Sequence, residues 1–461
     1  MRLGCALAVA ALGVIGACRR APAEGGAAPP DAATAGPADA QDAVVPARCR
    51  KTDVGFALDD GHGLADLEVG DAVAYPGGYA VGFVHRATAG RVAAVALLRR
   101  DPMGLARVVD LGPTIGDAPP PRVGWREGEL VAAAYTGPLD SRAASPEAGA
   151  PSLPGDATRD VALYTIAPAA SAAPAAAPLS VPQRRDDSLA LDVAFAAAAG
   201  LLVWDEATSV PRGVVKASAF TRERVSGARE VSPPDSDAEL PRVVPRGSGF
   251  AVVWIARRPD PGSGLDGSAN EATGEARSYG WLEMVAVDAQ AQPSGPVRRL
   301  TPVTGHVSAY DIAALEPFQG APPSFLVVAR DDGEAVDGSG GTLLRVRVTG
   351  EAVDPPVAIA TEGLGRGAPS FVAPSDTGGA AAVPGSPALA LAWVGKDEQA
   401  RLLPVDVSGA PTAPPSAEDA FNDARALLFT GAYPSATSSS DVLVATPSDS
   451  AAQLRVFACN R

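Results

Sequence analysis

The feature that most constrains the fold is a short apolar run that recurs seven times along the chain. In the clearest copy, Gly249 precedes an apolar run that ends in the anchor residue Trp254, and polar residues follow. Repeats of this kind, each too short to bury a core alone, predict units that stack on one another. The seven anchors, 50 to 75 residues apart, are Phe83, Tyr135, Trp204, Trp254, Ala329, Trp393 and Ala445.

The composition favours short strands over helices. The chain is 46% hydrophobic but only 5% aromatic, and its 49 glycines and 44 prolines divide the apolar residues into short runs. The alanine-rich segment 167–178, which could pass for a helix, carries repeated prolines that remove backbone donors. The sequence therefore predicts many strands and little helix. The large excess of arginine over lysine indicates a GC-rich genome and carries no mechanism by itself.

Each repeat can be divided into four strands, and the apolar run is the second of them. The fourth repeat reads Leu240 to Gly249, the apolar run, Trp281 to Asp288, and Val297 to Thr301. One closed ring of such units can use the whole chain, so the sequence predicts a single all-β domain, a seven-bladed β-propeller of four-stranded antiparallel blades. Six or eight blades stay open. An array of immunoglobulin-like sandwiches is disfavoured, because each such domain needs about 100 residues.

Low-complexity insertions account for the widest spacings between anchors. They are rich in glycine, proline, serine and acidic residues, which predicts surface loops. The insertions are Pro138 to Thr158, Pro259 to Ser278, Asp331 to Gly341, and Pro374 to Pro387.

The build of the repeat resembles that of bacterial exported β-propellers. In that loose pattern a turn glycine precedes the second strand, and the third strand ends in Val-Asp-x-x-Gly. This chain has related endings at Val287-Asp288 and at Val405-Asp406-Val407-Ser408-Gly409. The resemblance covers about residues 48–461 and implies an exported propeller.

The first 47 residues have the features of an export signal and a tether. An apolar stretch ends in Ile15-Gly16-Ala17-Cys18, which resembles a bacterial lipobox. The resemblance implies a signal peptide at residues 1–17, lipidation of Cys18 and anchoring to the membrane of the cell envelope. The outer membrane is implied because no aspartate follows Cys18. An ordinary secretory signal is the alternative. Residues 18–47, rich in alanine, proline and glycine, predict a disordered tether ahead of a propeller domain at 48–461.

The two ends of the chain predict how the ring closes. The last repeat stops without a fourth strand, while the segment Arg50 to Leu58 has strand character and belongs to no complete repeat. As the outer strand of the last blade it would run antiparallel to the preceding strand, which places Cys49 beside Cys459. With Cys5 removed and Cys18 lipidated, these are the two remaining cysteines of an exported chain, and a disulfide is predicted between them. Two free thiols are the alternative.

No local motif identifies a metal, cofactor or catalytic site. The histidines His62, His85 and His306 are far apart and lack a partner at metal-ligand spacing. The segment Asp59 to His62 is interpreted as an acidic turn. The acidic loop from Asp331 to Gly338 lacks the calcium-binding pattern, although a calcium site there stays open. No metal or cofactor is therefore predicted, and the catalytic residues, if there are any, stay unknown.

The sequence predicts a function only in outline. The formal charge of −15 argues against a nucleic-acid partner. The tryptophans Trp204, Trp254 and Trp393 are predicted to pack between blades, because they occupy equivalent positions. Repeats and a tether without a catalytic motif favour a non-catalytic binding or scaffolding module for an envelope protein or glycan. The alternative is a propeller hydrolase or lyase that uses carboxylates at the central funnel.

Overall fold

The computed structural model describes residues 49–460 with gaps, all within the unit Val45–Arg461. The longer gaps are 59–67, 137–159, 169–178, 182–189, 259–278, 334–340, 373–388, 419–425 and 429–438, and shorter ones interrupt other connections. The predicted signal peptide, Cys18 and the tether lie outside the described residues, as do His62 and most of the predicted surface loops. The described residues form strands and no helix, as the composition predicts.

The described strands form seven antiparallel sheets, numbered here in chain order. Sheet 1 is β2 (Glu68–Tyr75), β3 (Gly78–Ala87), β4 (Gly90–Arg100) and β5 (Met103–Thr114). Sheet 2 is β6 (Arg122–Arg126), β7 (Glu129–Thr136), β8 (Asp160–Ile166) and β9 (Leu179–Val181). Sheet 3 is β10 (Leu191–Phe195), β11 (Gly200–Ala207), β12 (Gly213–Phe220) and β13 (Arg229–Glu230). Sheet 4 is β14 (Asp237–Arg246), β15 (Gly249–Arg258), β16 (Tyr279–Val287) and β17 (Arg298–Arg299).

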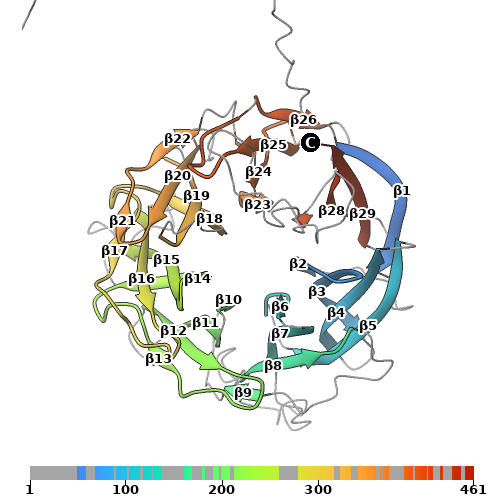
Figure 1. Cartoon of the computed structure of the whole chain (residues 1–461), viewed down its shortest axis with the longest axis horizontal. Helices are drawn as coiled ribbons and strands as arrows, with labels where there is room; N and C mark the ends of the chain where they lie inside the picture. Colours follow the sequence, from blue (N-terminus) through green and yellow to red (C-terminus); the bar gives the residue numbers. More distant parts are fainter. Residues whose placement is uncertain are drawn as a thin grey trace, which may run out of the picture. The chain divides into compact units, whose positions relative to one another are not determined.

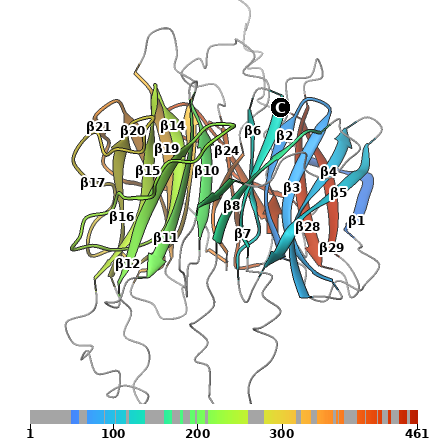
Figure 2. The same ribbon diagram turned by 90° about the horizontal axis from the view of Figure 1, so that it is seen from below.

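Sheet 5 is β18 (Val307–Leu315), β19 (Ser324–Asp331), β20 (Thr342–Thr349), β21 (Ala352–Val353) and β22 (Val357–Ile359). Sheet 6 is β23 (Ser370–Val372), β24 (Leu389–Val394), β25 (Ala400–Val405) and β26 (Ser416–Glu418). Sheet 7 is β27 (Ala426–Leu428), β28 (Ser439–Pro447), β29 (Ala452–Asn460) and β1 (Cys49–Leu58). Within the unit, consecutive sheets follow one another around a common centre, and the first strand of each repeat lies innermost (Figure 1). Figure 2 shows the same sheets after a turn of 90°, so that they are seen from the side.

The apolar runs are continuous because both faces of their strands are buried. Side chains alternate between the two faces of a strand. In β15, Phe250, Val252 and Trp254 therefore join the apolar cluster between sheets 3 and 4. The intervening residues of the same strand, Val253 and Ile255 among them, join the cluster between sheets 4 and 5. Similar clusters fill the interfaces of sheets 1 and 2, 2 and 3, and 5 and 6.

The anchor tryptophans belong to this packing, as predicted. Trp204 and Trp254 are fully buried and Trp393 is 4% exposed, so they are core residues rather than a ligand cage. Trp204 lies in the cluster between sheets 2 and 3, and Trp393 lies in the cluster between sheets 5 and 6. Fully burying a large apolar side chain contributes about 1.5–3 kcal/mol, so these repeated positions hold neighbouring sheets together.

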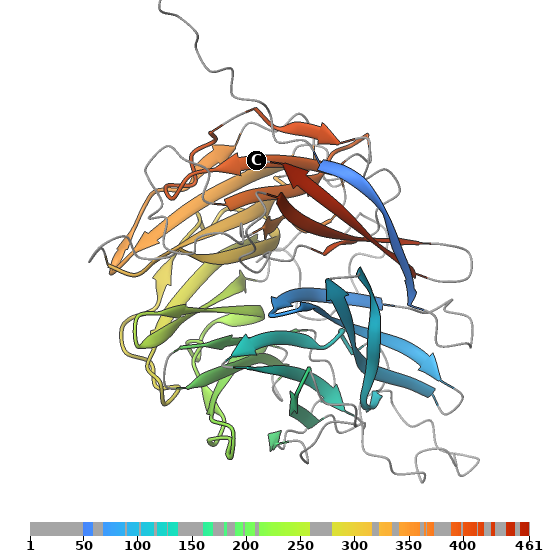
Figure 3. The same cartoon turned by 45° about the vertical axis from the view of Figure 1, so that its right-hand side comes forward.

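The N-terminal strand completes the sheet of the C-terminal repeat. β1 pairs antiparallel with β29, and the register places Cys49 opposite Cys459. Figure 3 shows the same arrangement, with the blue strand alongside the red ones. The predicted pairing of the spare N-terminal strand with the last strand is therefore confirmed. The predicted disulfide is a separate matter, because the register fixes the backbone and not the sulfur atoms.

The Val-Asp endings of the third strands make a specific turn. The Asp288 carboxylate accepts hydrogen bonds from the backbone N–H groups of Gln290 (2.8 Å) and Gln292 (2.9 Å). The Asp406 carboxylate accepts equivalent bonds from Ser408 (2.8 Å) and Ala410 (2.9 Å). An aspartate that satisfies two backbone donors stabilises a tight turn, which explains why the pattern recurs.

Arginine side chains connect neighbouring sheets. Arg107 of sheet 1 donates to the Ala167 carbonyl beyond β8 (3.2 Å), and Arg246 of sheet 4 donates to the Gly350 carbonyl beyond β20 (2.7 Å). Arg330 of sheet 5 donates to the Gly367 carbonyl ahead of sheet 6 (3.1 Å). A guanidinium carries several donors in a fixed fork, which lysine does not. These three arginines therefore connect neighbouring sheets through carbonyl groups of the next sheet's repeat or of a more distant turn.

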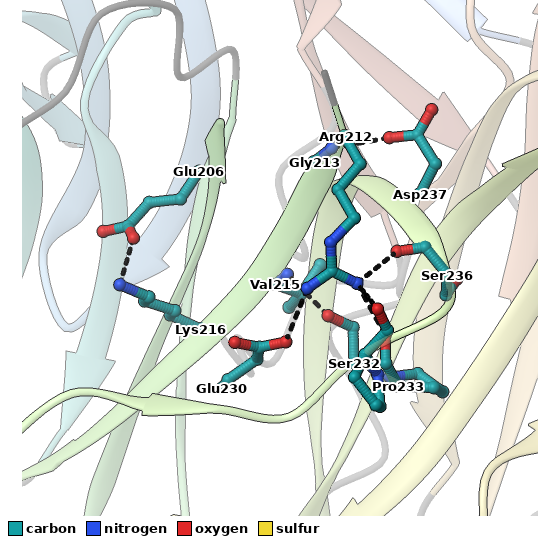
Figure 4. Close-up of polar contacts among 11 residues, drawn as sticks. Glu206, Arg212, Gly213, Val215, Lys216, Glu230, Ser232, Pro233, Ser236 and Asp237 are labelled. Atoms are coloured by element: carbon teal, nitrogen blue, oxygen red, sulfur yellow. Dashed lines mark hydrogen bonds and ion pairs between the residues drawn. The ribbon is translucent and has the colours of Figure 1, made fainter. Parts of the chain in front are cut away.

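Arg212 holds the connection from sheet 3 to sheet 4. Its guanidinium lies 3.4 Å from the carbonyl oxygens of Pro233 and Ser236 and 3.4 Å from the Glu230 carboxylate (Figure 4). Beside it, the Asp237 carboxylate accepts a bond from the Gly213 N–H (2.6 Å). These bonds fix the short path between the outer edge of one sheet and the innermost strand of the next.

Candidate active site

Four consecutive innermost strands each place a charged residue in one cluster, called here the central cluster. Arg122 lies on β6, Asp192 on β10, Arg242 on β14 and Asp311 on β18. The charges of all three other residues shift the pKa of Arg122, including that of Asp311, which lies three sheets further along. Groups on sheets 2 and 5 can interact in this way because the innermost strands face a common centre (Figure 1).

The two aspartates are held by backbone donors of the next sheet. Asp192 accepts hydrogen bonds from Val193 N–H (2.9 Å) and from Val243 N–H on β14 (2.9 Å). Asp311 accepts a bond from Phe371 N–H on β23 (2.7 Å). Each carboxylate therefore connects its own sheet to the following one and has a fixed position.

Tyr310 fixes β18 against sheet 4. Its hydroxyl lies 2.7 Å from the Leu240 carbonyl and 2.8 Å from the Val253 carbonyl, and its ring is buried. Burial is the main cause that raises the pKa of Tyr310 well above its usual value, and Asp192 and Asp311 raise it further. A buried, neutral hydroxyl that lies beside two carbonyl oxygens is a positioning group for the adjacent Asp311.

The environment makes the Arg122 guanidinium unusually acidic. Desolvation is the largest cause and the neighbouring charge of Arg242 is the second, and together they lower the pKa of Arg122 to about 9. Asp192, Asp311 and Tyr310 act in the opposite direction. Arg122 is therefore a cation at neutral pH, at an energetic cost that an additional anion in the cluster would reduce.

The pKa of Asp311 is shifted in the opposite direction to that of Arg122, upward. Desolvation raises the pKa of its carboxyl group, while Arg242, the N–H groups of Phe371 and Ile312, and Arg122 lower it, in that order of size. The net direction is upward, so Asp311 accepts a proton more readily than an ordinary carboxylate. A fixed, more basic carboxylate beside two arginines can bind an anionic group and take a proton from an adjacent carbon or water.

The described residues also line a pocket of about 370 Å³ between sheets 2 and 3. Leu163, Phe195 and Phe220 contribute apolar walls, and an ion pair between Arg222 and Glu129 (2.8 Å) lies at its edge. Its charges balance, since two arginines and two glutamates line it, and none of the four residues of the central cluster does. We therefore place the candidate active site at the central cluster and not in this pocket.

The structure does not bring His85 and His306 together, and His62 lies outside the described residues. His85 lies in sheet 1, 3.3 Å from the Asp110 carboxylate, and packs against Phe83 with ring centroids 5.4 Å apart. His306 precedes sheet 5 and stacks on Tyr279 at 5.3 Å. Within the described part of the chain, no group of three or more His, Cys, Asp or Glu residues could hold a metal ion.

The acidic loop after β19 uses its first carboxylates within the protein. The Asp331 carboxylate accepts bonds from the N–H groups of His306 (3.1 Å) and Gly333 (3.0 Å), and Asp332 pairs with Arg330 (2.6 Å). The rest of the loop and the turn at Asp59 and Asp60 lie outside the described residues. The alternative of a calcium site therefore gains no support from Asp331 and Asp332.

Sequence reasoning missed the central cluster, although the sequence contains a signal for it. Asp192, Arg242 and Asp311 each pair with the residue that precedes an anchor, at Val203, Val253 and Val328. In sheet 2, Arg122 pairs with Ala133, which lies two residues before the anchor Tyr135 and so one position away from this pattern. A charged residue inside an apolar innermost strand, at a repeated distance from the anchor, is the pattern that would have identified the site.

No protein-family model matches this chain, and no curated protein matches it in sequence. Solved structures do match its fold. The chain is similar to an ulvan lyase of polysaccharide lyase family PL25, with a TM-score of 0.50 and 12% identity over 85% of this chain and 94% of that one. It is also similar to a second polysaccharide lyase (TM-score 0.46, 7% identity, 85% and 89% covered). An exo-1,5-alpha-L-arabinanase from a bovine ruminal metagenomic library matches with a TM-score of 0.31 and 11% identity (65% and 97% covered).

These comparisons establish an all-β, propeller-type fold and correct one prediction. The prediction of a non-catalytic binding or scaffolding module is corrected, because the solved structure that shares this fold at a TM-score of 0.50 is a polysaccharide lyase, which favours the catalytic alternative. The absence of a local motif was misleading, since a site assembled from single residues on separate sheets leaves no motif. Among the described residues, no helix has the length and apolar character to cross a membrane.

Proposed function

We propose that this chain is an enzyme that cleaves a glycan at the central cluster. The observation that carries the proposal is the convergence of two arginines and two aspartates from four consecutive innermost strands, with Arg122 and Asp311 shifted in opposite directions from their usual pKa values. Charged groups that are held at a cost in stability, at the centre of a propeller-type fold, indicate a binding or catalytic site more than a structural one.

The charges of the site favour an acidic glycan. Arg122 and Arg242 are a pair of like charges, and a carboxylate or sulfate group between them would relieve their repulsion and the desolvation of Arg122. The ulvan lyase with the shared fold is bound to a glycan that contains GlcA, a uronic acid. A uronic-acid polysaccharide is therefore the substrate class that we propose.

The proposed reaction is β-elimination. With the uronate carboxylate neutralised by Arg122 and Arg242, the proton on the carbon next to it becomes more acidic. Asp311 takes that proton, a carbon–carbon double bond forms, and the bond from the neighbouring carbon to the glycosidic oxygen breaks. The leaving oxygen receives a proton from solvent or from an acid of the site. Tyr310 is a positioning residue, because its hydroxyl is occupied by two carbonyl groups.

Hydrolysis is the second candidate, and the pair of carboxylates favours it. The charges of Asp192 and Asp311 both act on Arg122, so both carboxylates belong to the surroundings of one guanidinium. One carboxyl group as the acid and one carboxylate as the base or nucleophile is the usual arrangement for cleaving a glycosidic bond with water. The two reactions give different products, so one assay distinguishes them.

The test is an assay of the purified chain against a panel of uronic-acid and neutral polysaccharides. Elimination gives products that absorb in the ultraviolet through the new double bond, whereas hydrolysis gives new reducing ends without that absorbance. We expect Asp311→Asn and Arg242→Gln each to reduce kcat by at least about 100-fold. The exposed residues Asp354 and Arg299 supply matched controls, Asp354→Asn and Arg299→Gln. Full activity in both cluster variants would contradict the proposal.

The finer architecture and the location of the protein are part of this proposal. The seven sheets are proposed as seven blades of a propeller that β1 closes. The chain is proposed to be a lipoprotein anchored through Cys18 in the bacterial outer membrane, with glycan as its partner. In cells, an alkyne-palmitate analogue should label the wild type and leave Cys18→Ser unlabelled. Equal labelling of both forms would refute the lipid anchor.

A further inference from the structure

We propose that Cys49 and Cys459 form a disulfide that fastens β1 to β29. The two residues are direct register partners in the antiparallel pair. Opposite residues of such a pair have Cα atoms about 4.5–5.5 Å apart. A disulfide requires Cα atoms about 4.4–6.8 Å apart. The backbone therefore already meets the requirement for the bond, independently of any enzymatic activity.

The register also explains why this end of β1 needs a crosslink. β1 is the outermost strand of sheet 7, and the pairing shifts between Lys51 and Gly55. Just three register pairs, those of residues 49–51, lie on the N-terminal side of this irregularity. Because Cys49 is the first residue of β1, separation of β1 from β29 that starts at this end breaks the pair of Cys49 first and then the next two pairs in turn. A bond at the first pair prevents that unzipping.

The chemistry is a dithiol–disulfide exchange. Two thiols lose two protons and two electrons and form one S–S bond, while the disulfide of a protein thiol oxidant takes up both electrons and both protons. The bond persists where the compartment is oxidising. It closes a loop of 410 residues (459 − 49), so it connects the first strand of the domain to the last one.

A peptide map of the full chain tests the bond directly. Trypsin cleaves after Arg48, Arg50 and Arg455, which releases the dipeptide Cys49-Arg50 and the hexapeptide Val456 to Arg461. After alkylation without reductant, we expect these two peptides to be joined and to separate on reduction. Alkylated forms of both peptides from protein exposed to an oxidising glutathione buffer would overturn the proposal, and so would either peptide joined to Cys5 or Cys18.

Thermal unfolding of single and double variants supplies an independent test. Long-loop closure and the size of the domain predict that Cys49→Ser, Cys459→Ser and the double variant all melt about 3–7 °C below the oxidised wild type. Reductant should lower the melting temperature of the wild type to the same value and leave the variants unchanged. Additive losses in the double variant, or a wild type that does not respond to reductant, would overturn the proposal.

Hydrogen exchange tests the bond even if the melting temperature of the variants changes little. The backbone amides of 50–58 should exchange faster in Cys49→Ser than in the oxidised wild type, while those of β15 stay protected in both. Ser440, the register partner of Cys459 on β28, provides the control variant Ser440→Ala, which should leave exchange of β1 unchanged. Equal exchange of β1 in the oxidised wild type and in Cys49→Ser would contradict a role for the bond in holding the strand.

Discussion

Replacing Arg122 by glutamine should change how the stability of the protein depends on pH. In the folded protein the pKa of Arg122 is about 9, whereas in the unfolded chain it has the much higher value of a free arginine. Above pH 9 the folded state has released this proton and the unfolded state still binds it. Stability rises with pH wherever the unfolded state binds more protons, so this group adds stability as the pH rises through 9.

The size of the effect follows from the same shift. At pH 7 the charged Arg122 destabilises the folded state, and linkage relieves this cost by about 1 kcal/mol between pH 7 and pH 10. The free energy of unfolding of the wild type, minus that of Arg122→Gln, should therefore grow by about 1 kcal/mol between these two pH values. Urea unfolding at pH 7, 8, 9 and 10 measures it, and the subtraction removes the titration of all other groups.

Two neighbours should move the effect in opposite directions. Asp192 favours the charged form of Arg122, so in an Asp192→Asn background the pKa falls further and the gain begins at lower pH. Arg242 repels that charge, so in an Arg242→Gln background the pKa rises and the gain at pH 10 shrinks. A difference that stays constant from pH 7 to pH 10, or two backgrounds that shift it in the same direction, would refute the electrostatic description of the cluster.

Three further outcomes are expected. Arg330→Lys loses the fork that bonds to the carbonyls ahead of sheet 6 and should lower the free energy of unfolding by about 1–3 kcal/mol, whereas the exposed Arg299→Lys should leave it unchanged. In Gly82→Ala the new Cβ would lie 1.9 Å from the carbonyl oxygen of Pro121, just ahead of β6, so we expect a loss of about 3 kcal/mol or more, while Gly227→Ala has open space and should be neutral. Because Arg122 and Arg242 are proposed to bind the carboxylate of an acidic glycan, salt should lower kcat/KM for that substrate, and a kcat/KM that does not depend on salt would contradict that substrate class.

The repeat pattern predicted the sheets because it reports burial on both faces of a strand. The run from Phe250 to Ile255 serves two interfaces at once, so every position in it is apolar and the anchor Trp254 stands out. The pairing of β1 with β29 was also predictable, since a strand was missing at one end of the chain and spare at the other. Both inferences depend on local pattern and on counting strands.

The central cluster could not be predicted in the same way. Arg122, Asp192, Arg242 and Asp311 are separated by 50 to 70 residues, and each is a single charge inside an otherwise ordinary strand. Their proximity depends on how the sheets stack around the centre, which no local window contains. The prediction of a non-catalytic module failed for this reason. The sequence also did not predict that Arg246 and Arg330 connect neighbouring sheets, because their partners are carbonyl groups far along the chain.

The most direct test of the proposed site is a crystal structure of Asp311→Asn, which should bind but not cleave, with a uronic-acid oligosaccharide. We predict one sugar carboxylate within hydrogen-bonding distance of the guanidinium groups of both Arg122 and Arg242, and its cleavable bond beside residue 311. A sugar chain bound elsewhere, with no anionic group at either arginine, would contradict the assignment of the central cluster as the active site.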